Sequence, residues 1–278
     1  MSSVLALASA VFFGFGDFCG GLSSRRLPVW QVAAGSQVLG LPVLAVGLAV
    51  VSAPVVSPGD LVNGVIGGVA GLIGLALLYG ALADGTMSVV APITGAVAAS
   101  VPVLVDVVFG TRLDGRQWAG VVVAIVAIVL LAGPGRVSLT SSLALRAVGA
   151  GLGFAAFFVA WSRTSIDSGL WPLLAARGVT IPIALGMALV VARRSGARSS
   201  DSGRRVWGLV ALTGVLDMAA NVSLALALQR GSLGVVSVLS SLYPAVTALV
   251  AIAILGERPG RFESIGIGGA VVAAILLA

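Results

Sequence analysis

The chain is divided almost entirely into apolar runs that short polar gaps separate. In hydrocarbon every backbone polar group needs an internal partner, so only helices or a closed barrel can cross a membrane. The runs have the length of helical spans and lack the alternation of barrel strands. The sequence therefore predicts an all-α integral membrane protein with ten transmembrane helices, at about residues 3–21, 29–52, 61–83, 86–109, 117–133, 143–162, 170–192, 206–229, 232–255 and 262–278.

Composition agrees with a membrane location. Hydrophobic residues make up 59% of the chain and charged residues only 9%, whereas a soluble domain has roughly 25% charged residues. The pI of about 11.2 does not indicate a nucleic-acid partner, because the basic residues are all arginines and almost all lie in the gaps between apolar runs. That distribution is typical of loops that flank a lipid bilayer.

The second half of the chain repeats part of the first. Residues 227–266 align without a gap to residues 81–120, and nine of the forty positions are identical. The matches include three glycines and an arginine, at Gly85/Gly231, Gly110/Gly256, Gly120/Gly266 and Arg112/Arg258. Five spans per repeat is an odd number, so the two copies enter the membrane in opposite orientations. We expect two inverted five-helix repeats, 1–135 and 143–278.

The arginines are divided unequally between the two membrane faces. Gaps 1–2, 5–6, 7–8 and 9–10 hold eleven, and the other gaps hold four. By the positive-inside rule the eleven face the cytoplasm and both termini lie outside. Prolines within spans should kink or unwind their helices, so we expect hinges near Pro102 and Pro244.

Ionisable groups within spans are costly and need a partner or a function. Arg177 and Asp217 lie on consecutive spans at compatible depths, with Asn221 one turn beyond Asp217. Two interpretations stay open for them. They form a buried ion pair that only neutralises both charges, or they line a cavity in which the guanidinium binds a carboxylate or phosphate.

Two further aspartates allow alternatives of the same kind. Asp17, in the first span, is either a proton-coupling acid or a partner of Arg25 or Arg26 at the end of the helix. Asp106, late in the fourth span, is expected to pair with Arg112. Catalytic groups are sparse, because the chain has no histidine and a single cysteine, which supply neither an imidazole base nor a zinc site. We expect no enzyme activity, no metal and no cofactor.

Several motifs together resemble the EamA family of the drug/metabolite transporter superfamily. The repeated pair is G-E-R-P with E-S-I-G at 256–266 and G-T-R-L with Q-W-A-G at 110–120. A subgroup pattern adds G-x-x-D-F at 14–18, S-R-R at 24–26, S-Q at 36–37, Y-x-A-L at 79–82, W-P-x-x-x-A-R at 171–177, D-x-x-x-N at 217–221 and L-Y-P-A-V-T at 242–247. The resemblance covers nearly the whole chain. Thr111 departs from it, since the family has a glutamate there.

The resemblance implies a secondary transporter of the bacterial inner membrane, a monomer or homodimer that exports amino acids, other metabolites or drugs by alternating access. The residues that fall on subgroup motifs become candidates for a substrate-binding cavity: Asp17, Gln37, Tyr79, Arg177, Asp217 and Asn221. We expect spans 1–4 and 6–9 to line this cavity and spans 5 and 10 to pack outside. The family is usually drawn with both termini in the cytoplasm, against the arginine count. The alternatives are a flippase for a lipid-linked substrate, a membrane enzyme acting on one, and a non-transporting structural subunit.

Overall fold

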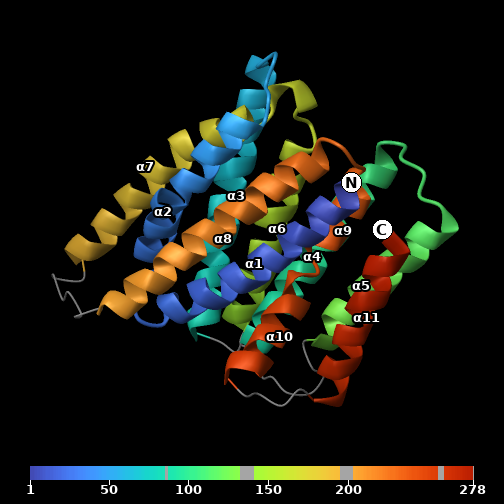
Figure 1. Ribbon diagram of the computed structural model, residues 1–278. Helices are drawn as coiled ribbons and strands as arrows, with labels where there is room; N and C mark the ends of the chain where they lie inside the picture. The colour runs from blue at the N-terminus through green and yellow to red at the C-terminus, as the bar shows by residue number, and fades with distance from the viewer. Residues whose placement is uncertain (85–86, 132–140, 195–202, 256–259, 278) are drawn as a thin grey trace.

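The computed structural model describes residues 1–84, 87–131, 141–194, 203–255 and 260–277, and within these ranges all regular structure is helical (Figure 1). The helices coincide with the ten apolar runs, and seven helices of the described residues are long and apolar enough to cross a membrane. This confirms the all-α, multi-span prediction. The elements are α1 Ser2–Ser24, α2 Val29–Val50, α3 Pro58–Asp84, α4 Met87–Val108, α5 Gly115–Leu131, α6 Ser141–Trp161, a 3-10 turn Ile166–Ser168, α7 Trp171–Arg194, α8 Arg204–Leu228, α9 Leu233–Ser240, α10 Tyr243–Leu255 and α11 Arg261–Leu277.

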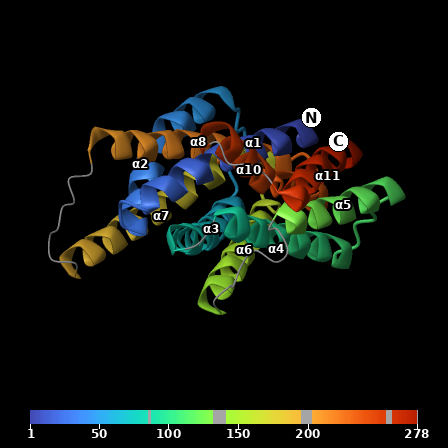
Figure 2. The ribbon, with the colours of Figure 1, turned by 90° about the horizontal axis from the view of Figure 1, so that it is seen from below.

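The helices pack in pairs that a two-fold relation between the repeats explains. Helix α1 packs on α8 as α6 packs on α3, and α2 packs on α8 as α7 packs on α3. Helix α4 contacts α6, and in the other repeat its counterparts α9 and α10 contact α1 in the same way. Helix α2 contacts its own counterpart, α7. Helices α5 and α11 lie side by side at one edge of the molecule in both views (Figures 1 and 2). This pattern is consistent with inverted repeats that interleave rather than form two separate bundles.

Glycines bring the interleaved helices into backbone contact. A Cβ atom on Gly214 of α8 would overlap the carbonyl oxygen of Ser36 on α2. At the equivalent crossing of α3 and α7, a Cβ on Gly64 would overlap the carbonyl oxygen of Pro172. Small residues at such crossings let membrane helices approach closely. At these crossings the glycines are therefore explained by packing.

The ninth apolar run is divided into two helices. Helix α9 ends at Ser240 and α10 begins at Tyr243, immediately before Pro244. The proline ring clashes with the carbonyl group four residues earlier, which here is that of Ser240. Helix α4, by contrast, continues past Pro92 and Pro102. Pro244 thus lies at a break in the helix and Pro102 does not, while a hinge role for either stays a prediction.

Candidate functional site

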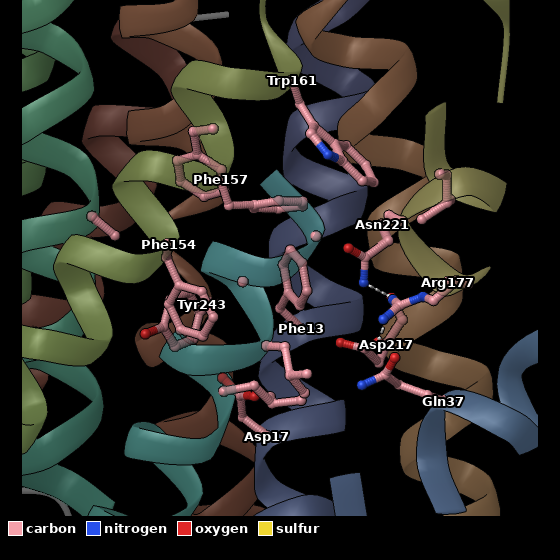
Figure 3. Close-up of a pocket in the computed structure, with 18 residues that line it drawn as sticks. Phe13, Asp17, Gln37, Phe154, Phe157, Trp161, Arg177, Asp217, Asn221 and Tyr243 are labelled. Carbon is pink, nitrogen blue, oxygen red and sulfur yellow. Dashed lines mark hydrogen bonds and ion pairs between the residues drawn. The ribbon is translucent and has the colours of Figure 1, made fainter. Parts of the chain in front are cut away.

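A partly open pocket lies between the interleaved repeats, and its volume, which includes space open to the surroundings, is about 710 Å³. Its lining residues come from α1, α2, α3, α4, α6, α7, α8 and α10, and none of them comes from α5 or α11. These are the eight spans that were expected to line a central cavity. Five of the six candidate residues lie in the lining: Asp17, Gln37, Arg177, Asp217 and Asn221 (Figure 3).

Tyr79 is the candidate that the structure does not bring to the pocket. It is 1% exposed and packs against α1, where a Cβ on Gly20 would come within 2.5 Å of the tyrosine hydroxyl. The ring fills the space that Gly20 leaves open. Its burial against α1, outside the pocket lining, indicates a role in helix packing.

Arg177 and Asp217 form an ion pair in the pocket wall. Nη2 of Arg177 lies 3.1 Å from Oδ2 of Asp217, and the two side chains are 11% and 13% exposed. Asn221 Nδ2 donates to the backbone carbonyl oxygen of Asp217 at 2.7 Å. The guanidinium Nε is buried without a hydrogen-bond partner among the described residues. The ion pair is therefore present, and it also faces the cavity. This geometry agrees both with a pair that neutralises the two charges and with a wall that binds a ligand.

Gln37 joins this polar wall through a threonine. Its Oε1 accepts a hydrogen bond of 2.6 Å from the Thr180 hydroxyl on α7. The Gln37 side chain is buried and its Nε2 has no partner in the part of the chain that the structure describes. Helices α2, α7 and α8 thus meet at one polar wall, which offers unused hydrogen-bond donors. Thr180 was not a candidate from the sequence, since one threonine in an apolar span carries no signal of its own.

Asp17 lines the pocket without a hydrogen bond or ion pair to any described residue. Of the two alternatives for Asp17, the contact with Arg25 or Arg26 is wrong, because both arginines are exposed at the end of α1 and neither pairs with Asp17. The neighbouring Gly16 packs on α8, where its Cβ would lie 3.6 Å from the backbone nitrogen of Asp217. The cavity therefore holds two carboxylates and one guanidinium.

An aromatic wall faces the polar one (Figure 3). It consists of Phe13, Phe154, Phe157, Phe158, Trp161 and Tyr243. The rings of Phe157 and Trp161 have centroids 4.4 Å apart, and the indole donates to the carbonyl oxygen of Gly64 at 3.3 Å. This wall was not predicted from the sequence. The signal was present, because the four α6 aromatics recur at i, i+3, i+4 and i+7, the spacing of one helix face.

The two walls differ because the repeats have diverged. When the offset of the repeat alignment is extended upstream, Asp217 and Asn221 correspond to Gly71 and Leu75, and these two residues line the same pocket from α3. Asp217 and Asn221 therefore lie on one side of the pocket, with a small and an apolar residue at the corresponding positions of the other repeat. Such a cavity suits a ligand with a charged end and an apolar body.

Buried hydrogen bonds join the loops on the face that holds both termini, where the Ser3 hydroxyl lies 3.5 Å from the carbonyl oxygen of Leu277. Asp60 Oδ2, at the start of α3, accepts from Ser168 Oγ at 2.5 Å and from the Ser165 backbone nitrogen at 3.1 Å. Gln229, after α8, donates to the carbonyl oxygen of Gly169 at 2.9 Å. The connections that follow α2, α6 and α8 are thereby tied together at this face.

Asp106 has a different partner from the one expected. Its carboxylate accepts from the backbone nitrogen of Gly234 at 2.7 Å and from the Thr111 hydroxyl at 2.8 Å. It thus caps the first turn of α9 in the other repeat. The predicted pair with Arg112 is wrong, as Arg112 is exposed and makes no ion pair with Asp106. Thr111, the departure from the family motif, supports this cap.

Comparison with known proteins identifies the family to which the chain is similar. The model of the EamA-like transporter family matches residues 1–133 and 141–278. A solved crystal structure superposes with a TM-score of 0.73 at 18% sequence identity, covering 99% of this chain and 95% of the other. At that identity the likeness shows the fold alone. Among curated proteins none matches the chain.

Proposed function

The chain belongs to the EamA-like transporter family, and from this premise we propose that it is a secondary-active carrier that exports small amphipathic metabolites by alternating access. The observation that carries the proposal is the pocket between the repeats, with its aromatic wall opposite a charged one. We propose amino acids with apolar side chains, or metabolites of similar shape and charge, as its cargo. The plasma membrane of a bacterium is the proposed location of this multi-pass protein.

The proposed binding mode uses the charges as they lie in the pocket. A carboxylate of the cargo would take up the unused donors beside the Arg177–Asp217 pair, since guanidinium groups suit planar carboxylates. An ammonium group would meet the unpaired carboxylate of Asp17. The apolar body would lie on the aromatic wall, where its transfer from water is favourable.

Alternating access is supported by the paired packing of the helices. Because the largest helix contacts of one repeat have counterparts in the other, exchanging the two conformations of the repeats would exchange closed and open faces. The hydrogen bonds around Asp60 tie the terminal face together. We infer that this network is the closed gate of one state.

Counterflow tests the carrier proposal. Purified protein in liposomes loaded with unlabelled amino acids should take up a labelled apolar amino-acid mixture, and Arg177→Ala should lower the initial rate at least tenfold, because the carboxylate loses a charged donor. Arg230→Ala, at an exposed site outside the pocket, is the matched control and should keep the wild-type rate. Uptake by Arg177→Ala equal to wild type would contradict the binding mode. Uptake by none of the three proteins would remove this cargo class.

Thiol labelling tests the gate. In a Cys19→Ser background, Leu173→Cys places a thiol in the pocket lining, which a membrane-impermeant reagent reaches only after the terminal face opens. Asp60→Ala removes hydrogen bonds to a buried carboxylate, and such bonds contribute about 1.5–3 kcal/mol each. We expect labelling from the terminal face to accelerate at least tenfold. An unchanged labelling rate would show that the network does not hold this face closed.

A further inference from the structure

Thr180 donates its hydroxyl proton to a side chain on another helix rather than to its own backbone. Hydroxyl groups in helices commonly donate to the carbonyl oxygen four residues earlier. Thr213 and Ser223 do so here, to Leu209 and Ala219, each at 2.8 Å. Thr180, which is 0% exposed, instead donates across to Oε1 of Gln37 on α2 at 2.6 Å. With the Thr180 proton used in this bond, the amide oxygen of Gln37 faces α7.

The opposite end of that amide is a buried donor in the pocket lining. Gln37 is 1% exposed, and its Nε2 has no partner among the described residues. Thr180 lies three residues after Arg177, hence on the same face of α7 and one turn away. The unpartnered Nε of Arg177 belongs to the same wall. Two donors from two helices are thus left without acceptors next to the cavity.

We propose that Thr180 determines the head-group specificity of the carrier, by holding Gln37 so that its Nε2 donates to an oxygen of an anionic cargo group at the polar wall that also holds Arg177. The inference rests on the proposed function and deepens it. A carboxylate offers only acceptors and satisfies both donors, whereas an ammonium group offers only donors and leaves them unpaired. A buried polar group left unpaired in this way is how sites reject the wrong ligand.

Three compounds with the same apolar body separate the head groups: phenylalanine, 3-phenylpropionate, which lacks the amine, and phenylethylamine, which lacks the carboxylate. Each is titrated as an inhibitor of counterflow by wild type, Thr180→Val and Thr180→Ser. Valine keeps the shape of threonine without the hydroxyl, so the Gln37 amide is free to turn its oxygen toward the cargo. Serine keeps the hydroxyl and serves as the matched control.

We expect Thr180→Val to weaken inhibition by phenylalanine and 3-phenylpropionate about fivefold to tenfold, the effect of one hydrogen bond. Inhibition by phenylethylamine should change less than about twofold, and Thr180→Ser should restore the wild-type pattern. If Thr180→Val weakens inhibition by all three compounds equally, Thr180 acts only in helix packing and the proposal is wrong. If it weakens inhibition by none of them, the proposal is also overturned. If wild type recognises none of the three, the proposed cargo class fails, and this inference with it.

Discussion

Replacing Asp217 with alanine while Arg177 stays in place is expected to destabilise the protein by about 3–5 kcal/mol and to abolish counterflow, because it leaves an uncompensated charge in a largely buried wall. Both side chains are close to nine-tenths buried, and their 3.1 Å contact joins α7 to α8. Chemical unfolding in detergent, followed beside the transport assay, measures the two effects separately. Wild-type stability in Asp217→Ala would contradict the importance of the pair.

The double variant Arg177→Met/Asp217→Leu then separates structure from function. Apolar replacements of a buried ion pair are often neutral or stabilising, so the double variant should regain most of the lost stability. If the pair only neutralises charge, transport should return as well. We expect transport to stay below about a tenth of the wild-type rate, since the cargo loses its charged donor.

Gly214→Val is the second change with a large expected effect. The new side chain would be forced against the carbonyl oxygen of Ser36 at the crossing of α8 and α2. Backbone cannot turn aside as a side chain can, so we expect a loss of about 3 kcal/mol or more, at the upper end of overpacking effects. Folded, monodisperse protein in detergent should fall sharply.

Gly208→Val is the matched control on the same helix. Gly208 is exposed and a Cβ there would meet nothing within 4 Å, so its stability should stay within about 0.5 kcal/mol of wild type. Equal behaviour of the two variants would mean that valine in α8, rather than the close crossing, causes the effect. Wild-type stability in Gly214→Val would show that the helices can separate without cost.

Local patterns in the sequence predicted the helices, and long-range pairing limited the prediction of the site. The length and hydropathy of the runs predicted the spans, and the proline ring explains the break before Pro244. Asp106 was assigned the wrong partner because its acceptor role is fixed by Gly234, which lies 128 residues away. Thr180 was missed for the same reason, since only the fold brings it to Gln37, 143 residues distant.

The candidate cavity was predicted in part. Ionisable groups in apolar spans are costly, which singled out Asp17, Arg177 and Asp217. The motifs of the resemblance added Gln37. The same motifs selected Tyr79, although the residue packs against Gly20 instead. The aromatic wall was overlooked because aromatic residues are ordinary in spans, and the regular spacing of those on α6 was their only distinguishing mark.

The interleaving of the repeats constrains how the chain is made. Helices α1 and α2 pack chiefly on α8. The ribosome synthesises α8 long after these two helices. Domains that fold during synthesis do so as complete units. The first five helices are not a complete folding unit, because their main packing partners lie in the second repeat. They must wait in the bilayer with the glycine-lined crossings of α2 and α3 facing lipid. A chain that stops after α5 should therefore be recognised as an orphan and degraded, and the two repeats should succeed or fail as a single folding event.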